Sequence, residues 1–502
     1  MFDQFHVAVV LLGILLTALV YRRFQSIKSN PRRLPLPPGP KPDPIIGNAR
    51  HFPVNTPWIT FTEWKKTYGD MIYMNALGTG MVIINSYEVS CDLMEKRAIY
   101  ADRPSMPFLG EMVGLNRTAL VAGYNDLWRR HRTIMHAPMQ RPAIETYWIE
   151  QQNVARSFLG TLLDKPKDFY SNLKLMSGKL IISITYGIQV ESSEDPYIIN
   201  AESTRAMVKY LSPTSALVNV FPIMRYIPSW FPGAKFKREA ARLREVADNM
   251  VGRPFERVKA DLAAGVAVPS LTTQLLESPI ADEEDIKWAT GTLYGAGADG
   301  IASILALFVL AMTLHPKVQK KAQEEIDRVI GKNRLPTFED RDSLPYLECI
   351  LKEIYRWYPI SPLGTPRRVT EDDYYNGYWI PAGSTVYGNN WAMSRDERMY
   401  KDGDRFSPER FEGIGAEKIL DPRTFIFGFG RRSCPGVHFV DATLYISMAY
   451  ILAGFNISKA KDANGNEITP EIIHTSEMIT RVNDFPCSIQ PRSPQVVDLI
   501  RD

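Results

Sequence analysis

The chain contains little cysteine. Among its 502 residues there are four, Cys91, Cys349, Cys434 and Cys487, and none of them forms a C-x-x-C pair. The sequence therefore indicates neither a disulfide framework nor a zinc site. The net charge is only +3, which gives no support to a nucleic-acid partner. No repeat or low-complexity linker divides the chain, and 45% hydrophobic with 23% charged residues is an ordinary globular composition, so we expect one large domain.

One of these cysteines stands in a glycine-rich loop. Residues 427–436 read Phe-Gly-Phe-Gly-Arg-Arg-Ser-Cys-Pro-Gly. Glycines let such a backbone turn tightly and approach a flat ligand. Backbone N–H groups can point at a sulfur and tune its charge, and an arginine can pair with a carboxylate of the ligand. The loop has what an iron-binding thiolate needs, and the alternative is a buried free cysteine.

The loop carries a resemblance to a known family. The pattern Phe-x-x-Gly-x-Arg-x-Cys-x-Gly is met in full by Phe427, Gly430, Arg432, Cys434 and Gly436. It resembles the haem-ligand signature of the cytochrome P450 family, most of all fungal microsomal members that tailor secondary metabolites. The resemblance implies a single large domain of P450 type with a long central helix. It also implies a haem b cofactor (iron protoporphyrin IX) with a cysteine thiolate as its axial ligand.

Two further segments resemble the haem contacts of that family. Trp128 and Arg132 are one helical turn apart, which can place an indole and a cation beside a haem propionate. Arg129 and Arg130 then face outward, and a solvated basic helix is the alternative for the whole segment. Arg367 follows a proline in the place where the family often meets a propionate, and a surface arginine on a strand is the alternative.

A charged triad is expected to be structural. Glu353 and Arg356 lie three residues apart on an apolar helix, so they share one face and are expected to be buried. A buried pair needs further partners to be tolerated. In the family that this chain resembles, Arg410 completes a triad that stabilises the haem-binding loop.

The expected catalytic segment departs from the family pattern. The central helix carries Asp299 at the usual acid position, but Gly300 stands where a threonine is usual, and Ser303 lies one turn away. A substrate hydroxyl or an ordered water can complete the proton relay, Ser303 can reach into the groove, or the reaction differs from plain hydroxylation. The sequence leaves these alternatives open.

The N-terminal segment predicts a membrane anchor. Val7 to Val20 is uncharged, Asp3 precedes it, and positive residues follow it, which places the body in the cytosol by the positive-inside rule. A cleaved signal peptide is the alternative. We divide the chain into an anchor at 1–24, a basic and proline-rich hinge at 25–44 and a haem-thiolate catalytic domain at 45–502, and expect a single pass through the endoplasmic reticulum membrane.

The remaining periodicity predicts a mainly α fold with a minor β part. The predicted helices are 145–163, 170–186, 236–264, 283–314, 316–330 and 345–358. The predicted strands are 73–77, 81–84, 366–369 and 385–388. The apolar segments expected to line a pocket are 105–113, 207–211, 361–365 and 474–479. The aromatic stretch from Val218 to Gly233 either dips into the bilayer or packs as an ordinary core loop.

The resemblance also implies a reaction and its partners. They are O2, an apolar small-molecule substrate such as a terpenoid, membrane lipid, and a separate flavoprotein reductase supplied by NADPH, since this chain shows no dinucleotide fingerprint. The expected activity is monooxygenation. Because of Gly300, the alternatives are a haem-thiolate isomerase or dehydratase and a haem-binding protein without catalysis. The sequence does not identify the substrate or the carbon attacked.

Overall fold

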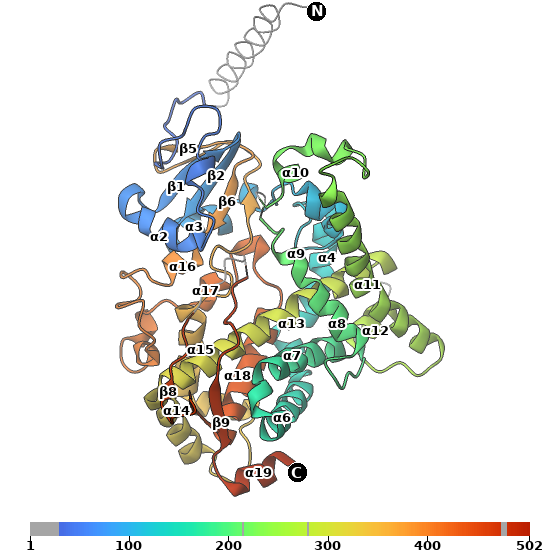
Figure 1. Cartoon of the computed structure of the whole chain (residues 1–502), viewed down its shortest axis with the longest axis vertical. Coiled ribbons are helices and arrows are strands. Elements are labelled where there is room, and N and C mark those ends of the chain that lie inside the picture. The colour runs from blue at the N-terminus through green and yellow to red at the C-terminus, as the bar shows by residue number, and fades with distance from the viewer. Residues whose placement is uncertain (1–29, 213–214, 279–280, 473–478, 502) are drawn as a thin grey trace, which may run out of the picture.

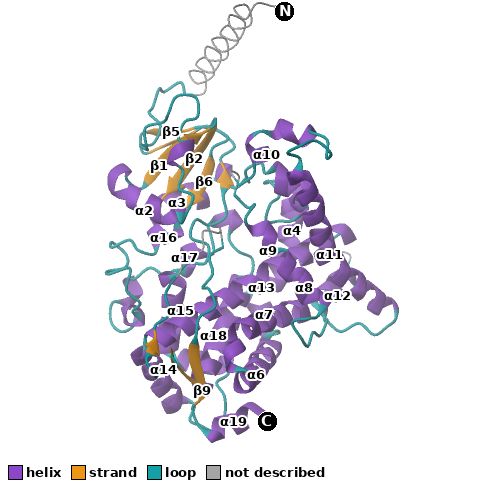
Figure 2. Ribbon diagram, viewed as in Figure 1, coloured by secondary structure: helices purple, strands orange, loops and turns teal. Residues whose placement is uncertain are grey.

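The computed structural model describes residues 30–212, 215–278, 281–472 and 479–501. The predicted anchor at 1–24 and the first part of the hinge lie outside the described residues, as does most of the predicted pocket loop at 474–479. Figure 1 shows β1, β2, β5 and β6 at one end of the molecule, β8 and β9 near the opposite end, and helices between them, and Figure 2 shows that strands are a minor part of the fold. The predicted mainly α fold with a minor β part is confirmed.

Long helices form most of the described chain. Their bounds are α2 Pro57–Tyr68, α4 Asp126–His136, α6 Trp148–Asp164, α7 Phe169–Tyr186, α11 Lys235–Ala263, α13 Glu283–Leu314, α14 Pro316–Val329, α15 Pro345–Trp357 and α18 Val437–Gly454. Shorter ones are α3 Tyr87–Ser90, α5 Arg141–Glu145, α8 Pro196–Ser203, α9 Arg205–Val208, α10 Leu217–Val220, α12 Leu271–Leu276, α16 Asn390–Met393, α17 Arg423–Ile426 and α19 Pro494–Arg501. Each of the six helices predicted from periodicity is present within three residues of its predicted ends.

The ends of these helices follow from local chemistry. Acidic residues fill the first turn of α13, where they stabilise the positive end of the helix dipole. Proline opens α14 and α15, at a position where its missing N–H has no helical partner. α7 ends at Gly187, which has a φ of +69° that favours glycine.

A small mixed sheet receives two distant parts of the chain. Its order is β1-β2-β6-β3, with bounds Met71–Ala76, Thr79–Ile84, Thr385–Gly388 and Arg367–Arg368. β1 and β2 form an antiparallel hairpin whose turn is Leu77–Gly78, because Ala76 already pairs with Thr79. β2 runs parallel to β6, and β3 pairs antiparallel with β6. The other sheets are β4 Asp373–Tyr375 with β5 Tyr378–Ile380, and β8 Glu467–Ile468, β7 Phe455–Lys461 and β9 Cys487–Pro491.

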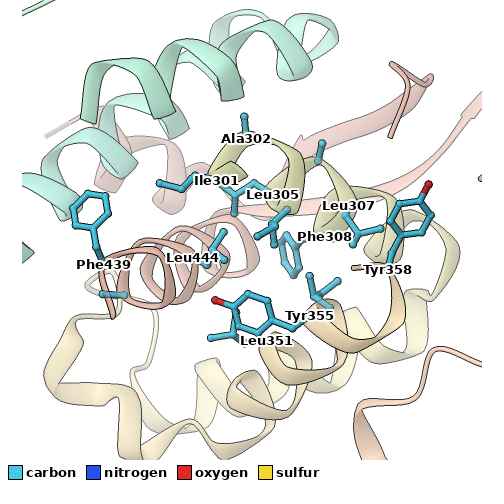
Figure 3. Close-up of a cluster of buried hydrophobic side chains, with 14 of the residues drawn as sticks. Ile301, Ala302, Leu305, Leu307, Phe308, Leu351, Tyr355, Tyr358, Phe439 and Leu444 are labelled. Carbon is cyan, nitrogen blue, oxygen red and sulfur yellow. The ribbon is translucent and has the colours of Figure 1, made fainter. Parts of the chain in front are cut away.

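Helix α13 runs through the centre of the main core. Figure 3 shows Leu305 and Phe308 of α13 gathered with Leu351 and Tyr355 of α15 and with Leu444 of α18. Within the described part of the chain, α13 and α18 are long and apolar enough to cross a membrane, yet each is 72% buried inside the protein. The predicted assignment of α13 as a core helix agrees with this burial.

A second, smaller core lies apart from the first. It gathers apolar side chains from the predicted pocket segments 105–113 and 207–211 with neighbours from α10 and α11: Met106, Phe108, Leu109, Val113, Val121, Met207, Leu211, Val218, Ala240, Leu243 and Ala247. These two predicted pocket segments belong to this second core, and neither contributes a residue to the cavity described next. Segment 361–365 instead contributes Ser361, Leu363, Gly364 and Thr365 to the cavity described next.

Candidate active site

An internal cavity of about 350 Å³ lies beside the cysteine loop. Its walls come from α4, from the middle of α13, from the chain that follows α15, and from residues 426–440. Side chains that line it are mostly apolar, among them Leu293, Ile304, Ile360 and Phe427. A cavity of this size and polarity is typical of a small-molecule or cofactor site.

The loop at 427–436 presents Cys434 to this cavity. Cys434 N–H donates to the Phe427 carbonyl at 2.7 Å, which closes the loop into a tight turn. Gly428 has a φ of +80°, a conformation that other residues rarely adopt. α18 begins at Val437, so the thiol lies just before the positive end of a helix dipole.

The surroundings of the thiol act on its charge in opposite directions. Burial raises the pKa of Cys434, while the backbone N–H of Gly436 and the charge of Arg132 lower that pKa. Arg132 Nη1 also donates to the Ser433 carbonyl at 2.8 Å, so α4 holds the residue before the cysteine. A bound metal ion deprotonates a coordinating thiol, and these two groups stabilise the resulting thiolate.

Four arginines line the same cavity, Arg103, Arg132, Arg367 and Arg432. Burial lowers the pKa of Arg367 to about 9 and that of Arg432 to about 10, and the charge of Arg432 lowers that of Arg367 further. Burial also lowers the pKa of Arg103 strongly, with Arg432 and Arg367 adding to the effect. Buried arginines that lower the pKa of their neighbours in this way are stabilised by an anion placed between them.

The described protein supplies only a partial counter-charge, since Asp102 raises the pKa of Arg103 and Arg432 but forms an ion pair with neither. Among residues 30–212, 215–278, 281–472 and 479–501, no carboxylate forms an ion pair with any of these four arginines. The nearest acid is Asp102, whose carboxylate is held instead by Arg368 at 2.5 Å and by the Tyr124 N–H at 2.7 Å. The four guanidiniums donate to backbone carbonyls instead, as Arg367 does to those of Met94 and Phe429, so their positive charge favours negative groups brought by a ligand.

An iron porphyrin with two carboxylates fits this arrangement. Cys434 would hold its iron, the arginines would pair with its carboxylates, and the apolar walls would enclose its ring. Within the described ranges, no three or more His, Cys, Asp or Glu residues cluster as candidate metal ligands. The donor set and charge of the cavity thus match haem b.

All the predicted haem-contact residues except Gly430 line the cavity. Trp128, Arg132, Arg367, Phe427 and Arg432 all line the cavity, as do Cys434 and Gly436. Asn125 caps α4 by accepting from the Trp128 N–H at 3.0 Å, which fixes the turn that carries the indole. The guanidinium stacked on that indole belongs to Arg432, whereas Arg132 points at Ser433.

Gly430 serves the loop from outside the cavity. It has a φ of +50°, and a Cβ there would lie 2.8 Å from the Cα of Glu95. The absence of a side chain lets the cysteine loop pack directly on the backbone of residues 94–95. Arg129 and Arg130 are about half-exposed and pair with Asp126 and Asp285, so they face outward as predicted.

The predicted triad is present and buried. Arg356 and Glu353 are fully buried and form a bidentate pair at 2.7 and 2.8 Å, and Arg410 joins Glu353 at 3.1 Å. Arg356 also donates to the carbonyls of Ser394, Gly403 and Arg405. The triad therefore ties α15 to the chain that precedes the cysteine loop, which is a structural role.

The three predicted catalytic residues do not meet in the cavity. Gly300 lines it, but Asp299 forms an ion pair with Arg481 at 2.5 Å, outside the cavity wall. The Ser303 hydroxyl donates to the Asp299 carbonyl at 2.8 Å and is buried within α13. Of the alternatives left open by the sequence, a hydroxyl supplied by Ser303 is therefore not supported.

Two residues were missed by sequence reasoning. Arg103 donates to the carbonyls of Leu120, Thr365 and Pro366 and lines the cavity, but it belongs to no recognisable motif. Arg481 lies in the C-terminal part of the chain, far from Asp299 in sequence, so no local spacing signals their pairing.

Comparison with known proteins gives a consistent result. The family model described as Cytochrome P450 matches residues 37–479. The chain is 40% identical to "Cytochrome P450 monooxygenase claR" of Ampulloclitocybe clavipes, over 94% of this chain and 89% of that protein. It is 41% identical to "Cytochrome P450 monooxygenase 176" of Postia placenta over 94% and 93%, and 39% identical to "Cytochrome P450 monooxygenase COX2" of Coprinopsis cinerea over 99% and 95%.

Proposed function

Since the chain belongs to the cytochrome P450 family and is a haem b-dependent monooxygenase, we propose that it hydroxylates an apolar small molecule at the cytosolic face of the endoplasmic reticulum membrane. The substrate class is a fungal secondary metabolite such as a terpenoid. Electrons come from NADPH through a separate flavoprotein reductase. The observation that carries this proposal is the Cys434 thiol in an apolar cavity that four arginines border.

The residues of the cavity have distinct roles in this proposal. Cys434 would hold the haem iron, and Arg103, Arg132, Arg367 and Arg432, which line the same cavity, would bind the propionates. When bound, the haem supplies the activation of O2 and the oxidation of a C–H bond. The chain itself positions the cofactor, excludes water with its apolar walls and controls the entry of protons.

The lining of the cavity supports an apolar substrate. On the α13 side the wall consists of Thr292, Leu293, Ala296, Gly297, Gly300 and Ile304. The Thr292 hydroxyl already donates to the Trp288 carbonyl at 2.7 Å. A substrate therefore meets a mainly apolar surface there, and a hydroxyl next to Gly300 has to come from the substrate or from water.

Exposed apolar residues support attachment to a membrane. The segment from α10 onward exposes Leu217, Phe221, Ile223, Tyr226, Trp230 and Phe231, with Trp230 78% and Ile223 74% exposed. Side chains of this kind anchor proteins at the boundary between lipid and water. Figure 1 shows α10 at the same end of the molecule as the start of the described chain. This exposure favours the membrane alternative for the stretch over an ordinary core loop.

The electron donor is proposed to approach near α4. Arg132 of this helix contacts the loop of Cys434, and Arg129 and Arg130 on its outer side are 54% and 53% exposed. Arg431 of the cysteine loop is exposed as well. Positive charge close to the thiolate side is complementary to an acidic flavoprotein.

The proposal is tested by turnover in membranes. Membranes containing this protein and a P450 reductase are incubated with NADPH and a panel of terpenoids, polyketides and aromatic alkaloids, and products are identified by mass. We expect an apolar member to gain one oxygen atom only when NADPH, O2 and the reductase are all present. Conversion that needs neither NADPH nor reductase would contradict the proposal and support an isomerase or dehydratase. A Cys434→Ala variant is the negative control.

A further inference from the structure

The acid of the central helix is held by a residue from the far end of the chain. Arg481 Nη2 donates to Asp299 Oδ2 at 2.5 Å. The Arg481 side chain is only 9% exposed, whereas that of Asp299 keeps 29% of its surface exposed. The carboxylate is thus fixed by a buried cation and still accessible.

The segment that carries Arg481 also contacts the cavity wall. Thr480 N–H donates to the Ile360 carbonyl at 2.7 Å. Ile360 lines the cavity, and its Cδ1 is the only described atom within 4 Å of a Cβ built on Gly300, at 3.8 Å. Residues 480–481 therefore bridge the acid on α13 and the wall that faces Gly300.

Other charged groups surround this ion pair on its outer side. Burial lowers the pKa of Lys174 on α7; Arg205 and Arg481 lower it further, whereas Glu202 and Asp299 raise it. Burial raises the pKa of Tyr170, one turn earlier on α7, and the same Asp299 and Arg481 act on it. The Asp299 carboxylate therefore acts on Lys174 and Tyr170 of α7, and Lys174 also interacts with Glu202 of α8 and Arg205 of α9, so these groups form a polar surround outside the apolar cavity.

We propose that Arg481 is a positioning residue for proton supply, which fixes the Asp299 carboxylate at the outer edge of α13 beside the opening left by Gly300. Asp299 takes a proton from the outer polar side and gives one to the cavity, so it is unchanged after each turnover. Full reduction of O2 to two waters uses four protons and four electrons from NADPH, and release as hydrogen peroxide uses two of each. Proton supply therefore decides how much O2 leaves as peroxide.

The test uses the full-length holoenzyme with its reductase, NADPH and O2, and no added substrate. The inference rests on the monooxygenase function. If that function is wrong, the wild-type enzyme does not oxidise NADPH, a result that is distinct from any change in the variants. The readouts are the ratio of water to hydrogen peroxide, the solvent isotope effect on NADPH oxidation, and the melting temperature. The variants are Asp299→Asn, Arg481→Met, the double variant and Arg481→Lys.

We expect Asp299→Asn and Arg481→Met each to lower the ratio of water to peroxide by about tenfold or more. The double variant should be no worse than either single one, because both remove the same function. Arg481→Lys keeps a cation, so its ratio of water to peroxide should stay close to that of the wild-type enzyme. The melting temperatures of the singles and the double should be non-additive, as for a direct ion pair.

A matched control is available in the same region of the chain. Arg492 pairs with Asp327 at 2.6 Å with similar exposure, and neither residue lines the cavity. Arg492→Met should leave the ratio and the isotope effect at their wild-type values. The proposal is overturned if Arg481→Met also leaves both unchanged, even with a lowered melting temperature, or if the effects of Asp299→Asn and Arg481→Met multiply independently in the double variant.

Discussion

The guanidinium carbon of Arg432 lies 4.6 Å from the centre of the Trp128 ring. Its nitrogens donate to the carbonyls of Ala101, Ala119 and Ala122 at 2.6 to 3.1 Å. Arg432 therefore fastens the cysteine loop both to α4 and to the chain between residues 101 and 122. A residue that sequence alone presents as a propionate contact also organises three segments around the cavity.

Arg432→Lys should lower both haem content and stability. Lysine keeps the charge but lacks the planar fork, so at least one buried carbonyl loses its donor, at a cost of about 1–3 kcal/mol. Chemical unfolding and the ratio of haem to protein measure the two effects. Arg431→Lys is the control because Arg431 is exposed. Equal behaviour of the two variants would contradict the structural role of Arg432.

Glu353→Gln should destabilise the protein strongly. It leaves the fully buried Arg356 without its anion, and breaking a buried pair in this way costs about 3–5 kcal/mol. Glu324→Gln is a matched control, because its pair with Lys320 is 78% and 65% exposed and such pairs contribute about 0–1 kcal/mol. The free energies of unfolding of the two variants are compared. A similar small loss in both would show that the triad adds little.

Two glycines of α13 should respond differently to alanine. A Cβ on Gly297 would lie 2.7 Å from Ile181 Cδ1, so Gly297→Ala should cost about 1–3 kcal/mol by overpacking against α7. A Cβ on Gly300 meets only Ile360 at 3.8 Å, so Gly300→Ala should be neutral or stabilising by up to about 1 kcal/mol. The melting temperatures of the two variants are compared. An equal decrease of the melting temperature in Gly300→Ala and Gly297→Ala would contradict the difference in packing.

Because Gly300 has this free space, Gly300→Thr should fold and retain haem. It places a hydroxyl at the cavity wall and should change the ratio of product to hydrogen peroxide. Gly300→Val is the control, since it has a similar shape without the hydroxyl. An unchanged ratio in Gly300→Thr, or the same change in both variants, would show that a hydroxyl at this position is not what matters.

His131 should make stability depend on pH near neutrality. Burial lowers the pKa of His131, and Asp285 opposes this in part. The unfolded chain, with an ordinary value of about 6.5, binds a proton more readily, so the contribution of His131 is present above about pH 6.5 and is lost as the pH falls. Its Nδ1 is buried without a partner, which agrees with a neutral ring.

The measurement is the melting temperature between about pH 5.5 and 7.5. The wild-type protein should lose stability on acidification more steeply than His131→Gln. Because α4 also carries Trp128 and Arg132, haem loss should follow the same profile. Parallel profiles of the two proteins would contradict this assignment.

The sequence predicted the main elements and the residues around Cys434 because those signals are local. Helical periodicity, the glycines of the cysteine loop and the three-residue spacing of Glu353 and Arg356 are all contained in short segments. The pairing of Arg481 with Asp299 could not be predicted, since 182 positions separate them. The place of Arg103 in the cavity could not be predicted either, because only the fold brings it close to Arg367 and Arg432.

The predicted position of Ser303 illustrates a second limit. Spacing along a helix places Ser303 on the same face as Asp299, but it does not say which acceptor the hydroxyl uses. In the structure it donates to a carbonyl of its own helix at 2.8 Å, as buried serines in helices commonly do. Spacing placed both Trp128 and Arg132 at the cavity, but it did not indicate that the guanidinium stacked on the indole comes from Arg432, elsewhere in the chain.

The central claim is that the Cys434 sulfur holds the haem iron, and the absorption spectrum of the reduced protein with carbon monoxide tests it most directly. We expect the wild-type protein and Cys487→Ser to show the red-shifted band of a thiolate-ligated haem. Cys434→Ser should lose that band. A Cys434→Ser variant that keeps the wild-type band would contradict the assignment of Cys434 and the account of the site built on it.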